Sequence, residues 1–73
     1  MSEKYTEEQA AIVRMLVRRA FKQSVKRGLS YRTLAPILKS DPSTVHRWFH
    51  GKTTPSQHHV EWIKRFLGYS EPR

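Results

Sequence analysis

Cysteine is absent from this sequence of 73 residues, so neither a disulfide framework nor a thiolate metal site can hold the chain together. Long hydrophobic runs are also lacking. The most apolar stretch, residues 10–17, contains Arg14 and is far shorter than the ~20 apolar residues of a membrane span. We expect a single domain over residues 1–73, with loose tails at 1–5 and 69–73, whose stability comes from one small apolar core.

Acidic residues are scarce. Six Asp and Glu stand against fourteen Lys and Arg, which gives a formal net charge of +8 at pH 7. Between Gln9 and Val60 the only acidic residue is Asp41. Such an excess of positive charge attracts polyanions, with nucleic acid as the first expectation and an anionic membrane as the second. No Ser/His/Asp or paired-carboxylate constellation has recognisable spacing, so we expect neither an enzyme nor a cofactor.

Strand-like alternation is missing, whereas helix caps and helical spacing of apolar residues occur four times, which predicts an all-α domain of four helices. The first helix is expected over Glu7–Arg27, because Thr6–Gln9 has the form of a capping box and Gly28 is a typical stop. Its core side should contain Val13, Leu16, Val17, Ala20, Phe21 and Val25.

Three shorter helices should follow. Ser30 is expected to cap the second, in which Pro36 should remove one backbone hydrogen bond and bend the helix. Asp41-Pro42 predicts the start of the third, which ends at Gly51. Thr54–Gln57 resembles a capping box for a fourth helix that closes at Gly68. The expected core residues of these helices are Leu34, Ala35, Leu38, Val45, Trp48, Phe49, Val60, Ile63, Phe66 and Leu67.

Two short helices, 29–38 and 42–51, joined by Lys39–Asp41, have the spacing of a helix-turn-helix. The segments 29–35, 43–48 and 51–55 resemble the Cro and phage-repressor family, the lambda-repressor-like DNA-binding domains. This resemblance covers about Ala20–Gly68 and implies a compact four-helix domain that binds DNA. The family usually has glycine where this chain has Lys39, so the lysine should cost about 1 kcal/mol or force another turn geometry.

The resemblance makes the third helix, residues 42–50, the recognition helix of the major groove. On a helical wheel its polar residues project away from the side that carries Val45 and Trp48. Arg47 is the best candidate for reading guanine, with a phosphate contact as its alternative role. The expected base-reading residues are Ser43, Thr44, His46, Arg47 and His50. The expected phosphate contacts are Tyr31, Arg32, Lys52, Thr53 and Thr54.

One recognition helix reads only a few base pairs, so we expect a homodimer on a palindromic operator with half-sites ~34 Å apart. Trp62 and Phe66 in the fourth helix form the slightly favoured dimer seam, and Ile12 and Met15 in the first helix form the other. These side chains could instead serve the core of a single domain.

Four histidines raise the possibility of a metal site. His46 and His50 lie one helical turn apart, but the His-Glu-x-x-His pattern of zinc hydrolases is absent, and we expect no metal. The sequence therefore predicts a cytoplasmic, nucleoid-associated regulator of transcription that binds double-stranded DNA, most simply a repressor, with no small-molecule effector and no membrane partner. The alternative is a protein-interaction module, of the antitoxin or adaptor type, built on the same scaffold.

Overall fold

The first helix, α1 (Glu7–Lys26), begins at the predicted capping box. The backbone N–H of Gln9 donates to Thr6 Oγ1 at 3.1 Å, and the N–H of Thr6 donates to Gln9 Oε1 at 3.0 Å. These two bonds satisfy donors that the helix itself cannot pair. Gly28, with φ +69°, follows the last turn in the left-handed conformation. The predicted boundaries of this helix are thus confirmed to within one residue.

Helices α2 (Tyr31–Ile37), α3 (Pro42–Phe49) and α4 (Gln57–Leu67) follow. Ser30 caps α2 and Asp41 caps α3, both as predicted, because each side chain accepts a hydrogen bond from the backbone three residues later. The predicted start of α4 was wrong. Its cap is Ser56 rather than Thr54, because Pro55 is buried and carries the extended loop two residues further before the helix begins.

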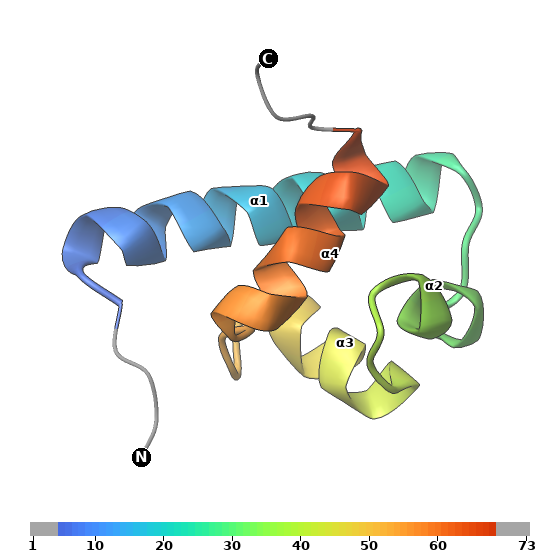
Figure 1. The fold of residues 1–73 in the computed structure, drawn as a ribbon. Coiled ribbons are helices and arrows are strands. Elements are labelled where there is room, and N and C mark those ends of the chain that lie inside the picture. Colours follow the sequence, from blue (N-terminus) through green and yellow to red (C-terminus); the bar gives the residue numbers. More distant parts are fainter. Residues whose placement is uncertain (1–4, 69–73) are drawn as a thin grey trace.

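The computed structural model describes residues 5–68, and within this range the fold is entirely helical. Helix α4 crosses α1, while α2 and α3 lie together below α1 (Figure 1). The buried side chains of all four helices form one core. Its fully enclosed members include Leu16, Leu34, Leu38, Val45 and Ile63. No helix in the described range is long and apolar enough to cross a membrane.

The last turns of α1 differ from the sequence prediction. Phe21 and Val25 were expected in the core but are 40% and 64% exposed. The core instead continues from Val17 through Ala20 to Ser24. These residues are three and then four positions apart, so they lie on one face of the helix. Ser24 tolerates burial because its hydroxyl donates to the Phe21 carbonyl at 2.7 Å, so no polar group is left unpaired.

The expected loose tails extended from residue 1 to 5 and from 69 to 73. Residues 1–4 and 69–73 lie outside the described part of the chain, but Tyr5 lies within it. Tyr5 packs against the core, and its hydroxyl donates to the Pro55 carbonyl at 2.7 Å. The prediction of a loose Tyr5 was therefore wrong, because this bond ties the approach to α1 to the loop before α4.

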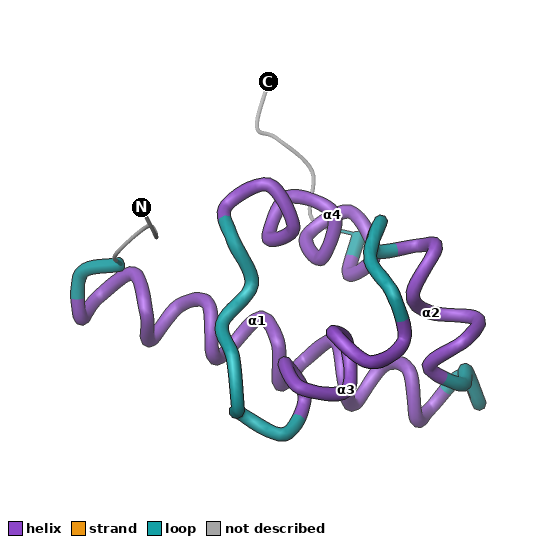
Figure 2. The backbone as a smooth tube through the Cα atoms, turned by 90° about the horizontal axis from the view of Figure 1, so that it is seen from below, coloured by secondary structure: helices purple, strands orange, loops and turns teal. Residues whose placement is uncertain are grey.

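The turn between α2 and α3 resolves the question that the sequence raised at Lys39. Lys39 adopts φ +56°, the left-handed conformation that normally favours glycine. The N–H groups of Lys39 and Ser40 donate back to the carbonyls of Pro36 and Ala35, which closes α2 with a Schellman motif. The turn thus keeps the geometry expected of a glycine. Figure 2 shows this short connection and the longer loop between α3 and α4.

Candidate nucleic-acid interface

Helix α3 has one buried side and one exposed polar side. Val45 is fully buried and Trp48 is only 5% exposed, so these two residues fix the helix against the rest of the domain. The opposite side presents four exposed polar residues, Ser43, His46, Arg47 and His50. These are four of the five residues that we predicted to read bases.

The rings of His46 and His50 stack on this exposed side, with centroids 3.9 Å apart and planes 19° from parallel. His50 Nδ1 lies 2.9 Å from the His46 carbonyl oxygen. Because a carbonyl only accepts, Nδ1 must carry the proton, and His50 Nε2 is left to face solvent as an acceptor when the ring is neutral. The pair therefore presents a flat, polar surface beside Arg47. Among the described residues, no three His, Asp or Glu side chains come close enough to hold a metal ion.

Thr44, the fifth predicted base reader, is placed differently. It is half-buried, and its hydroxyl donates to Asp41 Oδ1 at 2.6 Å while its backbone N–H donates to Oδ2 at 3.3 Å. The hydroxyl bond from Thr44 is the main cause that lowers the pKa of the Asp41 carboxyl below its ordinary value. The Thr44 hydroxyl hydrogen is thus engaged in the helix cap, so the hydroxyl cannot also donate to a ligand.

The start of α2 lies beside the middle of α3. The ring of Tyr31 meets that of His46 edge to face, with centroids 5.2 Å apart, and it also packs on Phe49 at 5.9 Å. Arg32 follows on the exposed side of α2. The predicted phosphate contact Tyr31 therefore borders the polar side of α3 directly, and Arg32 is the next residue along the chain.

The loop after α3 borders that surface at its other end. Gly51, with φ +72°, reverses the chain, and the N–H of Lys52 donates to the Arg47 carbonyl at 2.9 Å. Lys52, Thr53 and Thr54 are all exposed. We use "α3 surface" for the exposed residues Arg32, Ser43, His46, Arg47, His50, Lys52, Thr53 and Thr54 together with half-buried Tyr31. None of these residues is acidic.

Helix α4 braces the turn that sets the angle between α2 and α3. His59 Nε2 lies 3.3 Å from the Lys39 carbonyl and therefore donates to it, while Nδ1 accepts from the Ser56 hydroxyl at 3.0 Å. The Lys39 ammonium lies 5.0 Å from the centre of the Trp62 ring. These contacts give His59 a structural role that the sequence did not suggest.

The candidate dimer residues occupy unequal positions. Phe66 is only 8% exposed and carries the Arg27 guanidinium over its ring at 5.1 Å, so it offers little surface to a second subunit. Trp62 is half-buried between the cationic groups of Lys39 and Arg65. Ile12 and Met15 are 52% and 45% exposed. The aromatic edge that we favoured is thus mostly core, whereas the two residues of α1 are open.

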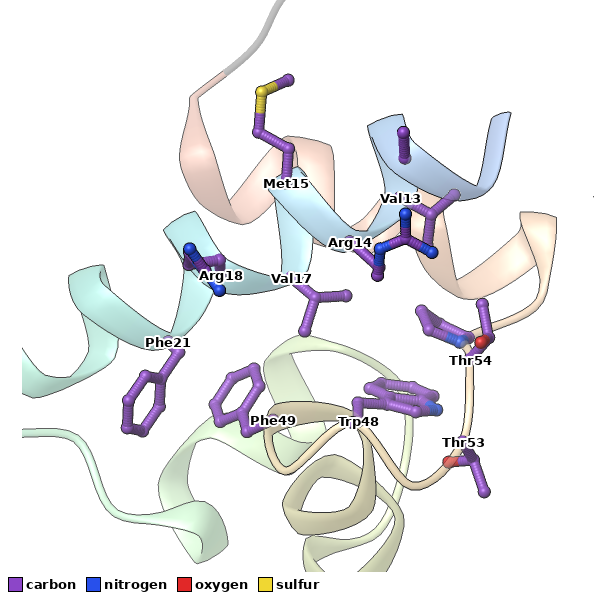
Figure 3. A pocket seen from close by; sticks show the side chains of 13 residues that line it. Val13, Arg14, Met15, Val17, Arg18, Phe21, Trp48, Phe49, Thr53 and Thr54 are labelled. Atoms are coloured by element: carbon purple, nitrogen blue, oxygen red, sulfur yellow. The ribbon is translucent and has the colours of Figure 1, made fainter. Parts of the chain in front are cut away.

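Sequence reasoning missed one feature next to the α3 surface. Arg14, Arg18 and the exposed Phe21 line a groove between α1 and the loop after α3 (Figure 3). The signal was present in the spacing, since Arg14 and Arg18 lie one helical turn apart and Phe21 follows on the same side.

Comparison of the chain with models of known protein families, with characterised proteins and with solved structures gave no match. The function of the α3 surface must therefore be inferred from its own chemistry.

Proposed function

We propose that this chain is a sequence-specific regulator of transcription, a repressor, that binds double-stranded DNA through α3. In this proposal α2 and α3 act as a helix-turn-helix of the lambda-repressor-like kind, and α3 enters the major groove. The observation that carries the proposal is the two-sided character of α3. Val45 and Trp48 hold one side in the core, while Ser43, His46, Arg47 and His50 leave the other side polar, exposed and free of acidic groups.

Each part of the α3 surface has a role in this proposal. Arg47 presents a planar fork of donors that matches the two acceptors of guanine. Ser43 and His50 offer groups that donate or accept at neighbouring base edges. Arg32, Lys52, Thr53 and Thr54 flank α3 and are suited to phosphate oxygens, which fix the register of a protein on a duplex. Asp41 is the single acidic residue between Gln9 and Val60, and its carboxylate caps the start of α3.

The electrostatic balance supports the same partner. The net charge of +8 attracts a polyanion over distances of about the Debye length, ~8–10 Å at physiological salt. A single α3 reads few base pairs, so we propose that two copies bind a palindromic site. Repression follows naturally from such binding, because a small domain on a promoter blocks access of polymerase.

A mobility-shift experiment tests this function. The protein is mixed with a pool of random duplexes, bound duplexes are recovered over several rounds in excess competitor DNA, and the enriched pool is sequenced. The proposal expects one common motif that binds at least about a thousandfold more tightly than random duplex. Equal affinity for all duplexes, or for an unrelated polyanion such as heparin, would contradict sequence-specific binding.

A further inference from the structure

A groove of about 620 Å³ opens between the middle of α1 and the loop that follows α3 (Figure 3). Val17, Trp48 and Phe49 form its floor. Arg14 and Arg18 stand on the α1 rim, and Thr53 and Thr54 stand on the opposite rim. This groove lies beside the α3 surface and shares Thr53 and Thr54 with it, while its floor is not part of that surface.

The floor of the groove is suited to an apolar side chain. Phe21 extends the floor along α1 and remains 40% exposed, although its ring already meets Phe49 edge to face at 5.2 Å. A second molecule that covered Phe21 and Phe49 would remove this apolar surface from water. A DNA phosphate would gain nothing there, because phosphate oxygens require donors and not aromatic rings.

The rim of the groove is suited to carboxylates. Arg14 and Arg18 are exposed and lie one helical turn apart, and none of the residues that line the groove is acidic. A second copy of this chain is a poor occupant of this groove, because between Gln9 and Val60 it offers only one carboxylate, Asp41, to pair with the two arginines. A ligand that combines carboxylates with an apolar side chain matches both the rim and the floor.

The walls are already fixed in the free protein. The Tyr5 hydroxyl donates to the Pro55 carbonyl, and the buried Pro55 anchors the loop. At the other end of the loop, the N–H of Gly51 donates to the Trp48 carbonyl at 3.1 Å. A groove with such walls binds without first having to order its own loop, which preserves affinity.

We propose that this groove binds an acidic amphipathic helix of a partner protein. An apolar side chain of that helix inserts over Val17 and Phe49, next to Phe21, and its carboxylates pair with Arg14 and Arg18. Helix-in-groove recognition of this kind reads apolar anchors at positions i and i+4. Binding of the helix does not depend on the proposed function.

One consequence does rest on the proposed function. Thr53 and Thr54 belong both to the groove and to the α3 surface, so an acidic helix in the groove brings negative charge to the place where a phosphate would sit. Occupation of the groove therefore opposes DNA binding, and an acidic partner would release the regulator from its site.

The test uses the full chain and a fluorescein-labelled Glu-rich peptide with leucines at positions i and i+4. A scrambled peptide of identical composition, whose leucines fall on different faces, is the control. Fluorescence anisotropy should show that the ordered peptide binds at least about tenfold more tightly, because burial of one leucine is worth that much or more. Equal binding of the two peptides would overturn the proposal, since only general charge attraction would remain.

Two pairs of variants locate the site. R14E/R18E should weaken the ordered peptide about tenfold, whereas K22E/K26E, with the same change of net charge on the same helix, should weaken it no more than about threefold through long-range attraction. Phe21→Ala should also weaken binding of the ordered peptide. Ile37→Ala removes another apolar side chain that is 40% exposed, and it should leave binding of the peptide unchanged. Equal effects within either pair would overturn the proposal.

An NMR titration supplies the readout that is independent of DNA. The ordered peptide should shift the amide signals of α1 and residues 51–55 and the Trp48 indole signal, and it should displace a bound duplex in a separate competition. Shifts confined to Ser43–His50 would overturn the groove assignment, as would a free protein already dimeric with its groove covered. If the peptide bound without displacing a bound duplex, the groove would still be a binding site for an acidic helix. Only the claim that this helix opposes DNA binding would be contradicted.

Discussion

The ammonium of Lys39 lies 5.0 Å from the centre of the Trp62 ring, which joins the turn between α2 and α3 to α4. A cation over the ring of a partly exposed indole is worth about 0.5–1 kcal/mol. The left-handed backbone at Lys39 costs about 1–2 kcal/mol, so the contact offsets part of that strain. Helix α4 thus helps to fix the angle between α2 and α3, the two helices that we assign to DNA binding.

A pair of substitutions measures the strain at Lys39. Lys39→Gly should be more stable than Lys39→Ala by about 1 kcal/mol, because only glycine adopts φ +56° without cost. At Lys22, which is exposed and lies inside α1, the order should reverse by about 1 kcal/mol in favour of alanine. Urea denaturation gives the four free energies of unfolding. An alanine as stable as glycine at position 39 would show that the turn is not strained.

The pH dependence of stability should report the cap of α3. The folded-state pKa of Asp41 is lowered, so its contribution is present above the ordinary aspartate pKa of about 3.9 and is lost as the pH falls through the lower folded-state value. Asparagine also caps helices but does not titrate. Asp41→Asn should therefore lose less stability than the wild type below about pH 4. Identical acid limbs in thermal denaturation would contradict a cap that depends on the ionised carboxylate.

Much of the fold could be predicted from the sequence, because helix boundaries depend on local chemistry. Thr6, Ser30 and Asp41 cap the helices that we assigned to them, since a capping hydrogen bond spans only three residues. The start of α4 could not be placed this way. Pro55 prolongs the loop because it is buried and bonded to Tyr5, which is a contact between residues 50 positions apart.

The same limit applies to the candidate site. Helical periodicity identified Ser43, His46, Arg47 and His50 as an exposed set, since one face of a helix follows from spacing alone. It also placed Phe66 in the core, where it lies, but it could not show that Phe21 leaves the core to pack on Phe49, because that depends on how α1 meets α3. The groove beside Arg14 was hidden for the same reason.

Salt dependence separates the residues that contact phosphate from those that merely add charge. The logarithm of the affinity should fall with the logarithm of salt concentration at about −0.9 per neutralised phosphate, for roughly 6–10 phosphates per dimer. Lys52→Ala should reduce the magnitude of this slope by about one for each subunit bound. Lys26→Ala removes the same charge from α1 and should leave the slope unchanged. Equal slopes for the two variants would remove Lys52 from the interface.

The proposed dimer makes a prediction about its seam. Met15 points away from Trp48 and Phe49 (Figure 3), so two copies joined at Met15 would present their α3 helices in opposite directions. Of the two candidate seams, we therefore expect a palindromic site on one duplex to use the α4 edge around Trp62. Trp62→Ala should abolish paired binding, whereas Lys39→Met, which removes the cationic contact with the ring but keeps Trp62 itself, should retain it. Met15→Lys should also retain it.

Light scattering with and without the selected duplex gives the number of copies bound. A wild-type protein that binds its selected site as a monomer would contradict the dimer. Loss of pairing in Met15→Lys but not in Trp62→Ala would move the seam to α1 and exclude a simple palindrome on one duplex.

The most direct measurement compares Arg47→Ala with Lys52→Ala on the selected duplex, on its single-base variants and on random DNA. Arg47→Ala should weaken binding to the selected duplex by about 1–3 kcal/mol and remove the preference at one base pair, while binding to random DNA changes little. Lys52→Ala should weaken binding to selected and random DNA alike. If Arg47→Ala weakened both equally and kept every base preference, α3 would not read bases through Arg47, and the central claim would be wrong.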